Sequence, residues 1–192
     1  LSEGTTAAAD SAPVDIAGSS FVIPDMRQRP ADGVLSLVAE AQLGAMLAYL
    51  DVPNWRLLAR AGQTPDAAQG RARVSGRIAR SLAPGVPFDA VSLDLSGTLE
   101  AVRSETLVPG RTLESPRLEL AVTSDGLTLD GPVTLDGVAA RMRWDQPFRR
   151  AGVIAADIAV TPDTLSAAGL SLPDGAVTGR GAARLDLTLG AD

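Results

Sequence analysis

The side chains of this chain that could do chemistry are almost all carboxylates and guanidinium groups. Its 192 residues include no histidine, no cysteine and no lysine, whereas aspartate and glutamate together number 23. The usual general base, the thiol nucleophile and the Schiff-base amine are therefore missing. The sequence also contains no GxSxG elbow, and a phosphate-binding loop of the GxxxxGK[ST] type needs a lysine. Only chemistry based on carboxylates remains open.

The aspartates are placed for turns more than for catalysis. Several of them directly precede a glycine, and both residues of such a pair tolerate the positive φ of a tight turn. These aspartates are Asp32, Asp125, Asp130, Asp136 and Asp174. Asp125, Asp130 and Asp136 could offer oxygen ligands to calcium, but their spacing matches neither the EF-hand nor the calcium-binding nonapeptide repeat. We therefore predict no catalytic residues, no metal site and no cofactor.

Charge and composition restrict the partners of the protein. The formal net charge is −6 and the sequence pI is about 4.7. Nucleic acid is not an expected partner, because phosphate neutralisation needs a concentrated basic surface. Hydrophobic residues make up 45% of the chain, mostly as aliphatic side chains. No run of them approaches the roughly 18 apolar residues that a membrane helix needs.

Two regions differ in character. Residues 1–16 are small, polar and aperiodic, which is typical of a linker or a poorly ordered terminus. Residues 17–192 are expected to form a single β-rich segment. Because the sequence starts with Leu1 and shows no targeting signal, we expect it to be a piece of a longer protein.

Apolar and polar positions alternate along most of residues 17–192, as in half-buried strands. In VSLDLSGTL, Val91 and Leu93 fall on one face, whereas Ser92 and Asp94 fall on the other. Similar alternation occurs in residues 71–78, 117–123, 139–144 and 182–189, and more weakly in 20–26, 34–41 and 153–160. Turn signals separate these segments, so we predict a mainly β fold: an antiparallel sheet of about ten strands in sequential order.

Two segments break the alternation and predict helices. Leu43, Met46 and Leu47 have helical spacing, and the pattern resumes after Asp51 to end near Ala61, which predicts a short helical insertion over 43–61. In the second segment, Thr161 can cap a helix that starts at Pro162, and Gly169 can stop it. A short helix is therefore predicted over 162–169.

The apolar face of such a sheet has two interpretations. It can be half of a filled sandwich or barrel core, or it can line a groove for an apolar ligand, and periodicity does not distinguish them. The arginines of the polar face, such as Arg73 and Arg141, likewise fit a solvated face or a contact with anionic headgroups; the solvated face is the favoured interpretation.

The order of features from Gly18 onward resembles the AsmA-like family of large Gram-negative envelope proteins, in the YhdP-type branch. A strand ends in FVIPD, a helical insertion with Pro65, Asp66 and Gly70 leads back into a strand, and the ladder SDGLTLDGPVTLDGVAARMRW ends in Trp144. The tail GLSLPDGAVTGRGAARLDLTLG is similar to the loop and returning strand that follow in the family.

This resemblance implies an elongated, strongly curved sheet, folded like a taco shell, with an apolar concave face. It implies a non-catalytic periplasmic module whose parent protein is anchored in the inner membrane and conducts phospholipid, or another acyl-chain lipid, towards the outer membrane. The groove-lining residues would be Val91, Leu93, Leu95, Leu118, Leu120, Val122, Met142, Leu185 and Leu187. The alternatives are a structural or assembly scaffold of the envelope with a filled core and, least favoured, a carboxylate-based hydrolase.

Overall fold

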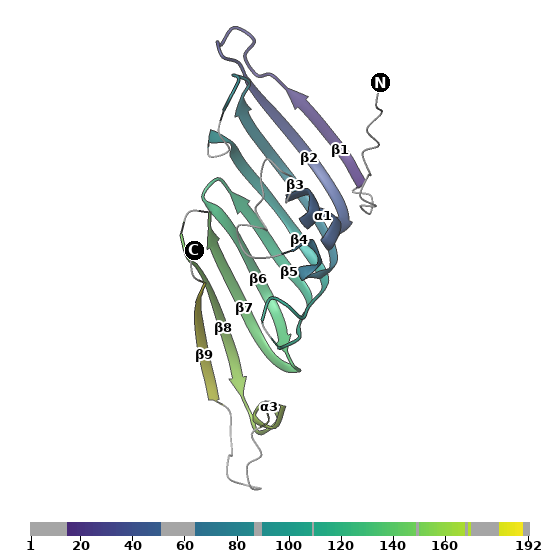
Figure 1. The fold of residues 1–192 in the computed structure, drawn as a ribbon, viewed down its shortest axis with the longest axis vertical. Helices are drawn as coiled ribbons and strands as arrows, with labels where there is room; N and C mark the ends of the chain where they lie inside the picture. Colours follow the sequence, from purple (N-terminus) through teal and green to yellow (C-terminus); the bar gives the residue numbers. More distant parts are fainter. Residues whose placement is uncertain are drawn as a thin grey trace, which may run out of the picture.

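In a computed structural model of the protein, the chain folds into one open antiparallel sheet (Figure 1). The structure describes residues 15–50, 64–86, 90–108, 110–148, 150–167, 169 and 181–189. Nine strands follow one another in sequence order, and each is hydrogen-bonded to its neighbours in the chain. This confirms the predicted mainly β fold and its sequential topology, with nine described strands against the expected ten or so.

The strands are long enough to give the sheet two extended faces. The nine strands are β1 (Asp15–Val22), β2 (Asp32–Gln42), β3 (Gln69–Ser81), β4 (Ser92–Ser104), β5 (Leu113–Thr123), β6 (Gly126–Leu135), β7 (Val138–Pro147), β8 (Gly152–Val160) and β9 (Gly181–Leu189). At a strand spacing of about 4.8 Å, the sheet extends roughly 38 Å across its strands. The edges of the sheet among the described strands are β1 and β9 (Figure 1).

The pairing register sorts the side chains into an apolar and a polar face. Paired residues share a face, so one row can be followed across the sheet through Ala39, Val74, Gly97, Leu120, Leu129, Trp144, Ile154 and Leu187. The adjacent row on the other face passes through Arg73, Thr98, Glu119 and Asp130. The alternation in the sequence thus becomes one aliphatic face and one charged face.

Helices are few and short. Helix α1 (Leu43–Leu50) follows β2 directly, which confirms the first half of the predicted helical insertion, while residues 51–63 lie outside the described part. A 3-10 turn, η1 (Pro65–Ala67), precedes β3. Helix α3 (Pro162–Ala167) starts where it was predicted to start. In α3, the amide of Thr164 donates to the Thr161 hydroxyl at 3.2 Å, and the Thr161 amide donates to the Thr164 hydroxyl at 2.7 Å.

Some of the Asp-Gly pairs form the predicted turns, and others lie within strands. Asp136-Gly137 joins β6 to β7, with φ of 49° and 84°, as a tight hairpin requires. Asp125 lies in the β5–β6 turn just before β6 begins. The predicted turns at Asp130 and Asp32 are wrong, because Asp130 pairs with Arg143 inside β6 and Asp32 opens β2 opposite Ser81. Asp174 lies outside the described residues.

An extra residue in β4 reverses the alternation in that strand. Gln69 pairs with Arg103 and Arg71 pairs with Glu100, so β4 contains one residue more than β3 between these pairs. Ala101 lies in this bulge with a φ of 49°. Strict alternation would place position 101 next to Leu99 on the apolar face. Because of the extra residue, Val102 takes that place instead. A similar irregularity occurs in β5 between Glu114 and Glu119.

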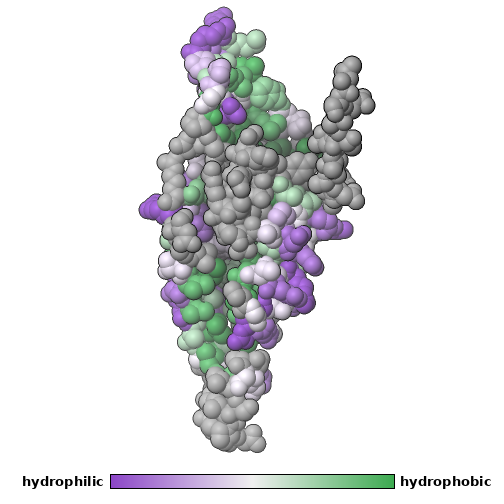
Figure 2. Space-filling model, in the orientation of Figure 1, coloured by the Kyte–Doolittle hydropathy of each residue, from purple (hydrophilic) through white to green (hydrophobic). Residues whose placement is uncertain are grey.

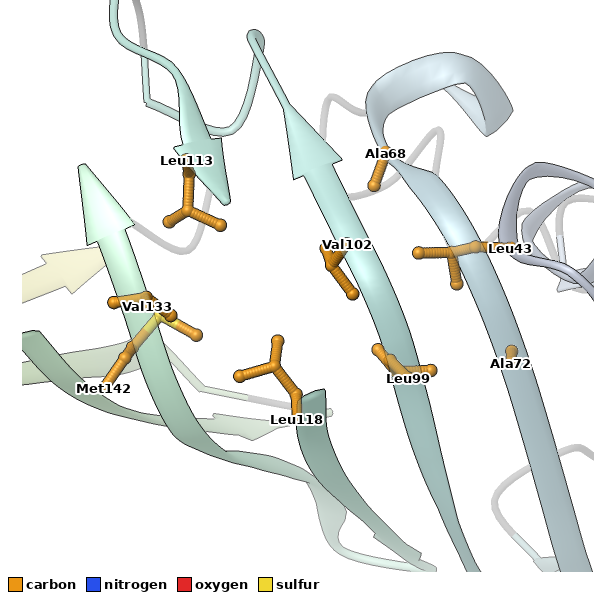
Figure 3. Close-up of a cluster of buried hydrophobic side chains, with 9 residues drawn as sticks. All are labelled: Leu43, Ala68, Ala72, Leu99, Val102, Leu113, Leu118, Val133 and Met142. Carbon is orange, nitrogen blue, oxygen red and sulfur yellow. The ribbon is translucent and has the colours of Figure 1, made fainter. Parts of the chain in front are cut away.

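A cluster of buried aliphatic side chains lies on the apolar face where α1 meets the sheet. Leu43 of α1 belongs to this cluster, and the other members come from the start of β3 and from the strands β4 to β7 (Figure 3). The buried members are Leu43, Ala68, Ala72, Leu99, Val102, Leu113, Leu118, Val133 and Met142. Among the described residues, no large side chain is less than 2% exposed. The core is therefore a shallow layer and not a fully enclosed interior.

Candidate functional site

The structure brings the predicted groove-lining residues to one face of the sheet. Leu95 pairs with Val122, and Leu120 pairs with Leu129 of β6. Leu185 and Leu187 of β9 follow on the same face, since they pair with Ala156 and Ile154 of β8. Val91 directly precedes β4 with the same alternation as Leu93 and Leu95. The residues share a face because each strand has the apolar alternation and the register aligns them.

These residues differ in how far a ligand could reach them. Leu118 and Met142 are only 2% and 5% exposed, since they belong to the buried cluster. The paired residues Leu95 and Val122 are half-buried. Val91, Leu93 and Leu120 are half-buried as well. Leu185 and Leu187 in the edge strand are 57% and 48% exposed. A ligand would thus touch the half-buried rows and the edge, while Leu118 and Met142 form the layer beneath.

Helix α1 covers one end of the apolar face and leaves other parts of it open. The helix contacts β2, β3 and η1, and its Leu43 packs with Ala72 and Leu99. Away from the helix, hydrophobic residues are visible on the face shown in Figure 2, both towards the β1–β3 end and over the later strands. Hydrophilic residues border them on the flanks. All nine described strands belong to this one sheet, so no second sheet of described strands covers the apolar face.

Two glycines of the apolar face mark a close approach of the β3 and β4 backbones. Gly97 pairs with Val74, and Gly76 pairs with Leu95, so the two glycines are diagonal neighbours. A Cβ atom at position 97 would lie 2.2 Å from the carbonyl oxygen of Arg73, and one at position 76 would lie 2.1 Å from that of Asp94. The two backbones approach so closely that no side chain fits at these positions.

Several residues of the apolar face were not predicted from the sequence. Leu127 and Leu129 lie between the Asp-Gly pairs at Asp125 and Asp130, which predicted turns, and both are half-buried strand residues on this face. Leu37 pairs with Gly76, and the exposed Phe21 packs over Gly33 at the β1 edge. The alternation of Leu127 and Leu129 indicates a strand, whereas the Asp-Gly pairs on either side of them indicate turns.

The polar face is covered by short ion pairs between neighbouring strands or within one strand. Arg73 contacts Glu40 at 3.1 Å, Arg117 contacts Glu119 at 2.8 Å, and Arg184 contacts Asp186 at 3.2 Å. Arg141 pairs with Asp130, and Arg143 with Asp145. These side chains are mostly exposed, so each pair contributes little to stability. Pairing with carboxylates agrees with the solvated-face interpretation of the arginine rows.

The charges of this face shift titration in the expected directions. Hydrogen bonds from the Arg143 guanidinium and then from the Thr128 hydroxyl, 2.9 Å away, lower the pKa of Asp145 below its ordinary value. The same contact raises the pKa of Arg143. A hydrogen bond to Glu119 raises the pKa of Arg117. Each of these shifts favours the charged form of Asp145, Arg143 or Arg117.

Within residues 15–50, 64–86 and the later described ranges, no three acidic side chains gather in a way that could hold a metal ion. A shallow depression on the polar face is lined by Glu40, Arg71, Arg73, Thr98 and Glu100. Arg73 and Glu40 already bind each other there. The buried serines Ser104 and Ser115 donate to the carbonyl oxygens of Ala67 and Pro132, at 2.5 and 2.6 Å.

Comparisons of this chain with protein-family models, with curated protein sequences and with solved structures found no match. None of the described helices has the length and the apolar character required to cross a bilayer.

Proposed function

We propose that this protein is a non-catalytic lipid-binding module, whose apolar sheet face holds the acyl chains of phospholipid or a related lipid. The observation that carries the proposal is the single open sheet, which has an aliphatic face and a charged face and no second sheet of described strands over the former. An apolar face of this extent needs a cover in water. Acyl chains supply one without requiring any particular side chain.

The chemistry of the face suits an acyl chain better than a polar ligand. Its rows are built mainly from leucine, valine, isoleucine and alanine, with Met142 and Trp144 in β7 and glycines at positions 76 and 97. Burial of each methylene group contributes about 0.8 kcal/mol, so ten methylenes contribute on the order of 8 kcal/mol before the cost of ordering the chain. The headgroup would stay at the hydrophilic flanks of the face, in contact with water.

This proposal extends to the protein from which the chain derives. The elongated sheet with sequential strands suits a segment of an AsmA-like protein of the YhdP-type branch, in the periplasm, with the parent anchored in the inner membrane. A sheet of roughly 38 Å is shorter than an envelope is wide, so further segments would have to continue the path. The absence of histidine, cysteine and lysine supports a role without catalysis.

The test compares matched pairs of aspartate substitutions on the two faces of β4 and β5. Leu95→Asp with Val122→Asp changes a directly paired, half-buried position on the apolar face. Ser96→Asp with Ala121→Asp changes the adjacent pair, which is exposed on the polar face. Both double variants place two carboxylates opposite each other, so they share the same cross-strand repulsion.

Native mass spectrometry, followed by lipid extraction from the same samples, measures the outcome. We expect the unchanged protein and the polar-face variant to carry phospholipid, and the apolar-face variant to lose most of it, because a buried carboxylate next to an acyl chain is strongly disfavoured. Circular dichroism checks that both variants keep their strands. Equal lipid content in the two variants, or lipid-free protein in all samples, would instead favour an envelope scaffold.

A further inference from the structure

A tryptophan and a glutamine of β7 interrupt the aliphatic rows of the apolar face. Trp144 pairs with Leu129 and Ile154. Gln146 pairs with Leu127, and both Trp144 and Gln146 are half-buried. From β2 to β6, the row that leads to Gln146 is apolar; it consists of Leu37, Gly76, Leu95, Val122 and Leu127. The two side chains therefore bring polar atoms into the face on which the proposed lipid would lie.

The hydrogen bonds of these two side chains leave the indole N–H weakly held. The Trp144 Nε1–H donates to the Gln146 Oε1 atom at 3.4 Å, which is longer than an ordinary N–H···O bond. The Gln146 Nε2 atom donates to the carbonyl oxygens of Pro147 and Arg150, at 3.1 and 3.3 Å. The amide group is thus fixed at both of its donor positions. The indole N–H, in contrast, can exchange its long bond for a shorter one to a ligand.

Burial on the apolar face decreases towards this end of the strands. Met142 of β7 is 5% exposed and belongs to the buried cluster, whereas Trp144 and Gln146 lie further along the strand and are half-buried. The cluster occupies the corresponding end of the neighbouring strands, at Val102 near the end of β4 and at Leu113, which begins β5. Helix α1 also packs on that end through the cluster. The face is therefore covered at one end of its strands and has accessible polar atoms at the other.

We propose that this accessible end receives the ester region of a glycerophospholipid, with the Trp144 indole N–H donating to an ester carbonyl oxygen. The inference rests on the proposed lipid function and adds the chemical class and the orientation of the lipid. Tryptophan suits such a boundary, because its ring is apolar and its single N–H needs an acceptor. A carbonyl oxygen is an uncharged acceptor, so it can approach a half-buried N–H at a small desolvation cost.

This contact sets the direction of the bound lipid. The acyl chains run from Trp144 along the half-buried rows towards the buried cluster. The headgroup projects past Gln146, where Arg150 is exposed to water. A lipid in the reverse orientation would place chain ends next to the indole N–H, which could then form no better hydrogen bond than the one to Gln146.

Lipids with and without ester carbonyls test the contact. The protein is incubated with vesicles that contain equal amounts of a diester phosphatidylcholine and its diether analogue, which have the same chain length and headgroup. After removal of the vesicles, native mass spectrometry measures the ratio of the two bound lipids. We expect a preference for the diester lipid of about twofold to tenfold, the range that one hydrogen bond contributes. Trp144→Phe keeps an aromatic ring without the N–H, so the preference should disappear.

Ile154→Val is the matched control, because Ile154 pairs with Trp144 and has no polar side-chain atom. It should lower the binding of both lipids alike and leave their ratio unchanged. Equal binding of the two lipids by the unchanged protein, or a preference that survives in Trp144→Phe, would overturn the contact and leave the proposed lipid function intact. Failure to bind either lipid would overturn both proposals.

Brominated acyl chains test the orientation. The chain has two tryptophans, so Trp144 is the only one left in Trp55→Phe and its fluorescence reports on one position. Bromine atoms quench the fluorescence of a tryptophan that they contact. We expect a phosphatidylcholine brominated near its ester groups to quench Trp144 more than one brominated near the terminal methyl groups. Equal quenching, the opposite order, or bound lipid that quenches in neither case would contradict the proposed orientation.

Discussion

Single residues decide how this sheet is strained and how its loops are fixed. Ala101 has a φ of 49°, in the left-handed region where a Cβ atom is crowded by the backbone. It is held there because β4 needs one extra residue to return its apolar side chains to the correct face at Val102. The position is exposed, so nothing but backbone conformation opposes a substitution.

Ala101→Gly should therefore stabilise the protein. Glycine adopts the required φ without steric cost, which outweighs its larger entropy loss on folding, and we expect a gain of about 0.5–1 kcal/mol in the free energy of unfolding. Urea denaturation measures the change. The neighbouring substitution Val102→Gly, at a buried position, should instead destabilise the protein. A loss of stability in Ala101→Gly would mean that the bulge is not under strain.

Asp136 fixes the loop before β5 to the β6–β7 turn. Its carboxylate accepts a hydrogen bond from the Thr112 amide at 2.9 Å and another from Arg111 at 2.7 Å. These bonds, the Thr112 amide first, lower the pKa of Asp136 below its ordinary value. A carboxyl whose pKa is lower in the folded state stabilises the fold above its unfolded pKa, and this contribution disappears as the pH falls through the folded pKa.

We expect Asp136→Asn to remove that pH dependence. Asparagine tolerates the positive φ and keeps one acceptor, but it carries no charge for Arg111. The variant should be less stable than the unchanged protein at neutral pH and equally stable in strong acid, where the aspartate is protonated. Urea midpoints measured from neutral to acidic pH give the difference. A constant difference across that range would contradict the assignment.

At the scale of elements, the β3–β4 pair depends on close backbone contact. Gly97→Val would place a Cβ atom 2.2 Å from the Arg73 carbonyl oxygen and 3.0 Å from the Val74 Cα atom. Backbone atoms cannot rotate away as a side chain can, so we expect a loss of more than about 3 kcal/mol in the free energy of unfolding, or no folding.

Ser96→Val is the matched control for this element. It lies one position away on the exposed polar face of β4, where a β-branched residue fits a strand well. We expect its thermal unfolding midpoint to stay close to that of the unchanged protein. Similar losses in both variants would show that β4 is intolerant of valine in general, and not that Gly97 marks a close approach.

At the scale of the whole molecule, the sheet is more an elongated surface than an enclosed body. Its described strands form one layer, its buried cluster is confined to the region near α1 and the central strands, and its edges are β1 and β9. The proposed lipid site is the aliphatic face of that surface.

The local pattern of strands and faces can be read from neighbouring residues alone. Alternation in segments such as VSLDLSGTL predicted strands and two chemically distinct faces, because a period of two depends only on neighbouring residues. The start of α3 at Pro162 followed from its local capping residues in the same way. The absence of histidine, cysteine and lysine was equally visible without a structure.

Which Asp-Gly pairs form turns, and which residues of the apolar face are exposed, depends on how the strands pack together. Asp130-Gly131 lies within β6 because Arg141 pairs with the aspartate, while the glycine leaves room for Leu118, whose Cδ2 atom would lie 3.0 Å from an added Cβ atom. Leu118 and Leu185 have the same alternation, yet one is 2% exposed and the other 57%. The pairing register and the burial of a side chain depend on contacts with other strands and with α1, and the periodicity within one strand carries no information about those contacts.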